Sequence, residues 1–244
     1  MPAFISSSSP CDNLLLGLLR ADSFNELVPF LETIDLKAKE TIGEKGKPPS
    51  YIYFPCTTVL SVLNQMLDGQ MVEVGTVGNE GFYGVDVLIG SEVATETTIC
   101  QVKGRALRMP AADFRRAIEA NVPLRQVTQR YLQAYMSMLS QSVACNRLHG
   151  IEARFARWVL MTQDRVRGDE FDLTQEFLAS MLGVHRPSVS LVAGAFQQAG
   201  IISYTRGHMT ILKRDALKEI CCECYAVVNT QFERTIGFSP GARN

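Results

Sequence analysis

The sequence predicts an α+β protein built from a β-rich N-terminal unit, one long helix and a C-terminal winged helix-turn-helix. Three observations support this fold class. Short β-rich runs separated by turn residues fill the segment from about 34 to 109, one helical pattern covers 121–146, and two short amphipathic helices lie within 173–199. We therefore expect domains at 1–120, 121–146 and 147–226, followed by a C-terminal tail at 227–244 that is disordered from about Thr235.

Composition places the chain among ordinary globular proteins. It has 244 residues, of which 46% are hydrophobic and 20% are charged, and this length suffices for two modest domains. No apolar run is long enough to span a bilayer, and the first residues lack the features of a signal peptide. We therefore expect a cytoplasmic protein with no membrane partner. Its seven cysteines are scattered and odd in number, which favours reduced thiols over a disulfide framework.

The N-terminal unit begins with one or two short helices over 11–31 and continues as strands. The strand-like runs cover 57–66, 70–77, 97–102 and 105–109, and glycine-containing turns at 68–69 and 103–104 separate them. Short strands at regular spacing are typical of a β-sandwich or jelly roll, that is, a double-stranded β-helix. Pro110 then begins a helix that extends through Ile118.

The long helix over 121–146 has apolar residues on two sides. The stripe that we assign to the dimer helix consists of Leu124, Val127, Tyr131, Ala134 and Met138. A second stripe on another face consists of Leu132, Met136, Leu139 and Val143. A helix that is apolar on two sides needs two partners, and we expect these to be the β-rich unit and the same helix of a second subunit. The alternative is an internal helix buried in a single larger core.

A helix-turn-helix follows, supported by a third helix that begins at Ile151. Thr174 can cap its first helix, and Gly183 supplies the backbone freedom that a tight turn requires. The second helix opens with polar residues and with Pro187, which suits a first helical turn. In DNA-binding proteins this end of the second helix points into the major groove. The alternative is a plain helical hairpin with no role in DNA binding.

A two-stranded hairpin over 201–212 is predicted directly after the second helix. Alternating residues flank Arg206 and Gly207, which we expect at the tip, and His208 lies next to them. A positively charged tip of this kind can contact the phosphate backbone beside the recognition helix.

Charge alone gives little support for a nucleic-acid partner. Residues 1–146 contain 12 Lys and Arg against 15 Asp and Glu, a net charge of −3, whereas residues 147–244 contain 12 against 10, a net charge of +2. Ten of the twelve C-terminal cations are arginines, which are suited to bidentate contacts with phosphate and guanine.

The order of these parts resembles the Crp/Fnr family of bacterial transcription regulators, whose N-terminal unit is a cyclic-nucleotide-binding β-roll. The likeness is sharpest in LTQEFLASMLGVHRPSVSLVAGAFQQAGII, residues 173–202. The resemblance implies that Arg186 contacts guanine and that Ser188 contacts phosphate. Pro187 and Leu191 replace a glutamate and a second arginine of many members, so we expect a different half-site.

The resemblance also implies a homodimer that binds palindromic double-stranded DNA and acts with RNA polymerase. We expect Arg186 to be the leading base contact. The residues that shape the half-site are His185, Pro187 and Ser190, and the candidates for backbone contacts are Ser188, Thr174, Gln175, Arg206 and His208.

In many family members a glutamate and an arginine of the β-roll bind a cyclic nucleotide. The resemblance places the corresponding pocket at Gly84, Val85, Thr97 and Thr98, where Val85 replaces the glutamate. Between Lys47 and Lys103 the chain has no Lys or Arg, although six acidic residues lie in that segment. Because a buried phosphate there would lack a cation, we expect an unidentified effector and no conventional cyclic-nucleotide binding. Backbone N–H groups remain an alternative way to hold a phosphate.

We expect no cofactor and no metal site. The first histidine is His149, which removes the commonest haem ligand from the β-roll, and the four cysteines before it show no clustered spacing for an iron–sulfur centre. Cys221, Cys222 and Cys224 form the only cysteine cluster, and on a helix Cys221 and Cys224 would face the same way. Buried or idle thiols are the favoured interpretation, and metal binding or redox sensing is the alternative.

Two other functions remain open at this point. A cupin-like enzyme would need histidines in the β-roll, and a protein-interaction module would use the helix-turn-helix for protein contacts. Because the sequence also lacks a nucleophile elbow and a phosphate-binding loop, we expect no enzymatic activity.

Overall fold

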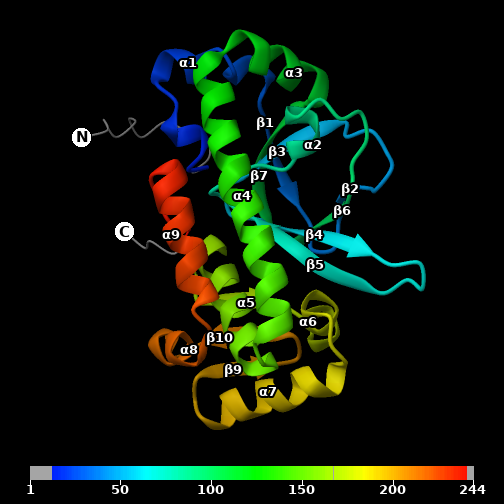
Figure 1. The fold of residues 1–244 in the computed structure, drawn as a ribbon, viewed down its shortest axis with the longest axis vertical. Helices are drawn as coiled ribbons and strands as arrows, with labels where there is room; N and C mark the ends of the chain where they lie inside the picture. The colour runs from blue at the N-terminus through cyan, green and yellow to red at the C-terminus, as the bar shows by residue number, and fades with distance from the viewer. Residues whose placement is uncertain (1–12, 167, 241–244) are drawn as a thin grey trace.

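The computed structural model describes residues 13–166 and 168–240. Figure 1 shows a β-rich unit at one end, the long helix α4 (Val122–Leu148) running beside it, and a small helical domain at the other end. This arrangement confirms the predicted α+β fold class. Cys11, the predicted start of the first helix, lies outside the described residues.

The N-terminal unit opens with short helical turns and continues as two facing sheets. The helical elements are η1 (Leu16–Leu18), α1 (Ala21–Asn25) and η2 (Val28–Phe30). The strands are β1 (Glu32–Leu36), β2 (Thr41–Gly43), β3 (Tyr51–Pro55), β4 (Val59–Gln65), β5 (Met71–Val77), β6 (Thr97–Val102) and β7 (Gly104–Pro110). One sheet has the antiparallel order β1-β7-β3 and the other β2-β6-β4-β5. Helix α2 (Val85–Leu88) lies between β5 and β6, and α3 (Ala111–Ala120) follows β7.

Aromatic side chains fill the space between the sheets and the helices. Phe54, Phe82 and Phe114 are buried in mutual ring contact, and Tyr131 of α4 packs against Phe82 at a centroid distance of 5.2 Å. Ring pairs of this kind contribute beyond the apolar area that they bury. Helix α4 is therefore an integral part of the β-rich core.

Helix α4 buries one stripe and exposes another. The five residues that the sequence assigned to the dimer helix, Leu124, Val127, Tyr131, Ala134 and Met138, are all buried in the core of their own protomer. These side chains are therefore not available to a second subunit, which corrects their assignment. On the other stripe Leu132 and Leu139 are half-buried, and Met136 and Val143 remain 61% and 72% exposed.

The C-terminal domain, which we define as residues 151–220, packs around a second core, to which Val59, Leu63 and Val102 of the β-rich unit also contribute. It contains α5 (Ile151–Val166), β8 (Glu170–Asp172), α6 (Gln175–Leu182), α7 (Arg186–Gln198), β9 (Ile202–Thr205), β10 (His208–Ile211) and α8 (Arg214–Ile220). Phe155 of α5 meets Phe196 of α7 edge to face at 5.3 Å. The apolar faces predicted for α6 and α7 lie in this core.

The chain then returns to the N-terminal unit. Helix α9 (Cys224–Ile236) lies alongside α4 in Figure 1, and its side chains Val228, Phe232 and Ile236 are buried in the first core. Their spacing of four residues places them on one helical face. The expected tail at 227–244 and the expected disorder from Thr235 are therefore wrong up to Pro240, and residues 241–244 lie outside the described residues.

Polar contacts join α5 to the β-rich unit, among them a hydrogen bond of 2.9 Å from the Gln101 amide to the Thr162 hydroxyl. Arg165 and Glu80 form a salt bridge of 2.8 Å, with side chains that are 1% and 0% exposed. Trp158 donates its indole N–H to Glu73 at 2.9 Å. Burial raises the pKa of the Glu73 carboxyl, while the donors Ser61, Thr76 and Trp158 oppose that shift. The two halves of the molecule are thus fixed to each other by buried charge as well as by apolar packing.

Over residues 13–166 and 168–240, no helix combines the length and the apolar character that crossing a membrane requires.

Candidate nucleic-acid interface

The first helix of the candidate interface, α6, is capped at both ends by residues next to it in the sequence. Thr174 is its N-cap and accepts a hydrogen bond from the backbone N–H of Phe177 at 3.2 Å. Gly183 ends the helix in the left-handed region, with φ of 62°. A side chain at that position would be strained, which explains the glycine in the turn.

The N-terminus of α7 points its first side chains to the surface. His185 is the N-cap and makes no side-chain capping bond, and Pro187 lies in the first turn. His185, Arg186 and Pro187 are exposed, and Ser188 is half-buried. The free N–H groups and positive dipole end of a helix N-terminus favour an anion such as a phosphate.

Two predicted contact residues are bound to each other across the turn. The Ser190 hydroxyl donates to the side-chain oxygen of Gln175 at 2.6 Å, and it also lies 3.2 Å from the Arg186 carbonyl. Gln175 and Ser190 therefore hold α6 and α7 in register, while the amide NH2 of Gln175 remains able to donate outward.

The hairpin packs its tip beside the start of α6. Arg206 and Gly207 both have positive φ, 52° and 81°, as a two-residue hairpin turn requires. The backbone N–H of Leu173 donates to the Gly207 carbonyl at 2.6 Å, and the Tyr204 hydroxyl donates to the Leu173 carbonyl at 2.6 Å. The exposed Arg206 is thus held next to the capped N-terminus of α6.

Comparison with known families gives the same division of the chain. Residues 153–220 match the Crp-like helix-turn-helix domain, and residues 33–121 match the cyclic nucleotide-binding domain. The chain belongs to the Crp/Fnr family. A comparison with curated proteins gives no match.

Solved structures of Crp/Fnr regulators share the fold at low sequence identity. A crp/fnr-family regulator from Eubacterium rectale has a TM-score of 0.64 and 17% identity, over 83% of this chain and 94% of that one. A CRP-family regulator from Thermus thermophilus has a TM-score of 0.61 and 19% identity, over 86% of this chain and all (100%) of that one. FixK2 from Bradyrhizobium japonicum has a TM-score of 0.64 and 12% identity, over 79% and 98%.

The hairpin of this Crp/Fnr protein has a third strand that sequence reasoning missed. β8 pairs with β10, so the sheet order is β8-β10-β9. The segment before Leu173 is polar and has no alternating pattern that predicts a strand, because two of the three strand residues, Glu170 and Asp172, are exposed acids. Only Phe171, which is buried, gives a strand signal.

The third strand places carboxylates around His208. Its Nδ1 lies 2.9 Å from Asp172 Oδ1, and its Nε2 lies 3.6 Å from Glu170 Oε2. Asp172 also pairs with Lys103 of the β-roll at 2.9 Å. The hydrogen bond with Asp172 raises the pKa of His208, and the bonds from His208 and Lys103 lower the pKa of Asp172. Through Asp172, His208 therefore connects the hairpin to Lys103 of the β-roll. His208 is also a candidate phosphate contact.

This linkage predicts a pH-dependent stability contribution. A histidine whose pKa is raised by folding stabilises fully below its unfolded pKa, and the contribution is lost as the pH rises through the folded pKa. We expect His208→Gln to lower the urea midpoint at about pH 6 and to have little effect at about pH 9. His185→Gln, which removes an exposed imidazole outside this network, is the matched control. An equal loss at both pH values would show that packing, and not charge, is what His208 contributes.

The residues predicted to form an effector pocket pack against or form hydrogen bonds with other residues of the β-roll. Gly84 has φ of 122°, and a Cβ there would come within 2.3 Å of Ile52. Val85 packs against the first core, Thr98 is buried in β6, and the Thr97 hydroxyl accepts the backbone N–H of Lys45 at 3.2 Å. Nearby, Thr95 donates to the buried Asp86 at 3.0 Å. A carboxylate thus occupies the first turn of α2.

Leu191, which by resemblance takes the place of a second arginine of many family members, is exposed in the structure. This side chain lies on α7 and is 77% exposed, although its neighbours Val189 and Val192 are buried in the core. Its place on the polar face of an amphipathic helix accounts for this exposure.

Proposed function

We propose that this protein is a homodimeric, sequence-specific regulator of transcription that binds double-stranded DNA through α7. The observation that carries the proposal is the N-terminus of α7, where Arg186 is exposed beside an N-cap without a side-chain hydrogen bond. An arginine at this position of a recognition helix can form two hydrogen bonds with guanine in the major groove. A cytoplasmic location and contact with RNA polymerase belong to the same proposal.

The exposed stripe of α4 supports the dimer. Gln129, Gln133, Met136, Ser140 and Val143 are exposed and recur at spacings of three and four residues. This is the periodicity of a two-helix seam, in which the partner helix covers the apolar positions. Two copies of α4 packed along this stripe would present two copies of α7 to one duplex. We expect the half-sites to be inverted repeats about one DNA turn apart.

The surface of α7 suggests how the half-site is specified. Arg186 offers guanidinium donors to guanine, whereas Pro187 and Leu191 offer only apolar contacts. An apolar side chain in the major groove favours the methyl group of thymine. We therefore propose a half-site with one arginine-contacted guanine and at least one position selected through a thymine methyl group.

The signal that controls the protein is proposed to be other than a conventionally bound cyclic nucleotide. Val85 offers no hydrogen bond to a ribose, and Asp86 places a buried carboxylate where an anion would approach α2. Like charges in a poorly solvated site repel strongly.

Selection of bound sites from random duplex DNA, followed by binding measurements on the selected site, tests the proposal. We expect Arg186→Ala to weaken specific binding by about 1–3 kcal/mol and to relax the preference at one base pair of each half-site. Wild-type binding should also weaken steeply with salt concentration. Fluorescence anisotropy on the selected site and on single-base variants measures both effects.

Arg115→Ala is the matched control, since Arg115 is an exposed arginine of α3, outside the C-terminal domain. It should leave both the affinity and the base preference unchanged. A selected site whose preferences are the same for Arg186→Ala and for the wild type would reject the role of Arg186. Failure to select any site would reject the proposed function.

A further inference from the structure

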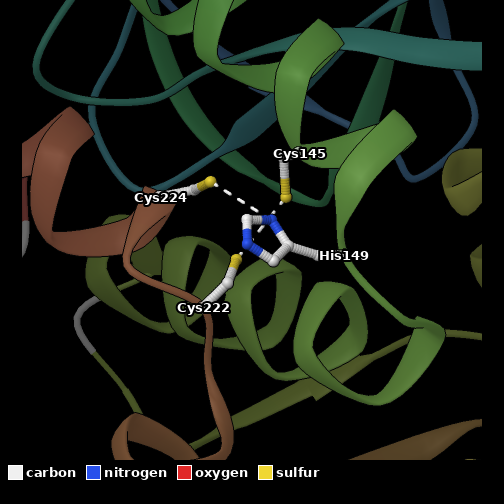
Figure 2. Close-up of side chains that lie close together, drawn as sticks. All are labelled: Cys145, His149, Cys222 and Cys224. Atoms are coloured by element: carbon white, nitrogen blue, oxygen red, sulfur yellow. Dashed lines mark hydrogen bonds between the residues drawn. The ribbon is translucent and has the colours of Figure 1, made fainter.

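Four potential metal ligands from distant parts of the chain meet at the end of α4. Cys145 lies in the last turn of α4, and His149 is the C-cap of that helix. Cys222 lies between α8 and α9, and Cys224 is the first residue of α9. Their three sulfur atoms and one ring nitrogen all lie within 4.8 Å of one another. Figure 2 shows the imidazole of His149 directed between the three thiols. Cys145, Cys222 and Cys224 are buried, and the side chain of His149 is 23% exposed.

Two of the distances among these atoms match the edges of a tetrahedron around a single ion, and the other distances do not exceed 4.8 Å. Zinc bonds of about 2.3 Å to sulfur and about 2.0–2.1 Å to nitrogen imply edges of about 3.8 Å between sulfurs and about 3.5 Å between sulfur and nitrogen. Cys145 Sγ lies 3.5 Å from Cys222 Sγ, and Cys224 Sγ lies 3.6 Å from His149 Nδ1. An iron–sulfur cluster would spread its ligands further apart, because its own iron and sulfide atoms lie between them.

The surrounding side chains orient the ligands as in protein metal sites. The other ring nitrogen of His149, Nε2, lies 3.1 Å from a carboxylate oxygen of Glu223. A carboxylate behind a histidine fixes the ring and directs the lone pair of its other nitrogen toward the metal. The Gln141 amide donates to Cys224 Sγ at 3.0 Å, and the buried Arg157 lies in electrostatic range of Cys145. These groups can compensate the negative charge of three thiolates.

We propose that Cys145, His149, Cys222 and Cys224 bind one zinc ion in a closed tetrahedral site. Three thiolates and one imidazole are a ligand set that zinc uses in structural sites, and four protein ligands leave no position for a substrate. The ion would join the end of α4 to the segment between α8 and α9, next to the Gly150 junction at which the C-terminal domain begins. The sequence expectation of no metal site is revised accordingly, and the helix on which Cys221 and Cys224 would face the same way does not include Cys221. Residues 221–223 lie outside α8 and α9, which places Cys222 beside Cys224.

The test uses the full chain, purified under reducing conditions, freed of metal with a chelator and titrated with Co²⁺ and then Zn²⁺. We expect one equivalent of Co²⁺ to produce thiolate charge-transfer absorption and the intense visible bands of tetrahedral cobalt, and one equivalent of Zn²⁺ to abolish them. Cys145→Ser and Cys222→Ser should each lose the stoichiometric cobalt spectrum. Glu223→Gln should retain it with affinity lower by about tenfold to a hundredfold.

Cys221→Ser is the matched control, because Cys221 is adjacent in sequence to the proposed ligands but is not one of them. Its thiol lies 3.3 Å from the Cys222 carbonyl, and its side chain packs against the core of the C-terminal domain. It should bind cobalt as the wild type does. Circular dichroism and Trp158 fluorescence establish that each variant is folded. Folded wild-type protein without the tetrahedral cobalt spectrum would overturn the proposal. Equal loss of cobalt binding in Cys221→Ser would also overturn it. So would a Cys145–Cys222 disulfide, in place of bound metal, in protein purified under reducing conditions.

Discussion

Arg165→Met will lower the free energy of unfolding by about 3–5 kcal/mol, because it leaves the Glu80 carboxylate buried without its cation. Glu80 is fully buried, and Arg165 binds one of its oxygens through two nitrogens, at 2.8 and 2.9 Å. The same arginine donates to the Met161 carbonyl at 2.8 Å. Urea unfolding measures the loss, with Trp158, the single tryptophan, as the fluorescent probe.

Two further variants distinguish buried charge from a general effect of losing a cation. Lys47→Met removes an exposed salt bridge with Glu44 and should cost at most about 1 kcal/mol. Glu80→Leu combined with Arg165→Met removes both charges and should recover part of the loss. An Arg165→Met protein as stable as the Lys47→Met protein would mean that Glu80 finds another partner or takes up a proton.

The double variant Met136→Glu with Val143→Glu is expected to be monomeric and to bind a complete two-half-site operator about a hundredfold to ten-thousandfold more weakly. The reason is that four carboxylates would face one another along the proposed α4 seam, and linkage of the two recognition helices supplies that factor through effective concentration. Sedimentation equilibrium measures the mass of the assembly. Anisotropy on complete sites and on isolated half-sites measures the two affinities.

The matched control is Val28→Glu with Ile89→Glu, which places the same charges at two exposed apolar residues outside α4 and outside the C-terminal domain. This control should remain dimeric with unchanged operator affinity. A Met136→Glu, Val143→Glu protein that still sediments as a dimer would contradict the placement of the seam, although the DNA-binding role of Arg186 would stand.

Local chemistry made much of this fold predictable. Short stretches of sequence contain the signals for the cap at Thr174, the turn at Gly183 and the three-and-four spacing along α4. Each of these signals acts on residues only a few positions away. The same holds for the hairpin turn at Arg206 and Gly207, where backbone conformation selects glycine. The predicted recognition helix, its exposed opening residues and the division of the chain follow from such signals.

Contacts between distant segments were not predictable. Cys145 and Cys222 lie 77 positions apart in the sequence, and no pattern of local spacing predicts that their thiols are in contact. Periodicity showed that α4 has two apolar stripes but not which one faces its own protomer, because that depends on where the β-roll and α9 lie. The helix α9 itself was missed because its apolar residues, four apart, lie beyond the last motif that the sequence analysis recognised.

The return of α9 to the first core changes how the C-terminal domain can move. The polypeptide leaves the N-terminal unit at Gly150 and rejoins it at Cys224, so the intervening domain is tethered at both ends. A displacement of the C-terminal domain relative to the N-terminal unit must therefore be accommodated in both chain connections. It must also preserve or break the buried Arg165–Glu80 and Trp158–Glu73 contacts between the two parts.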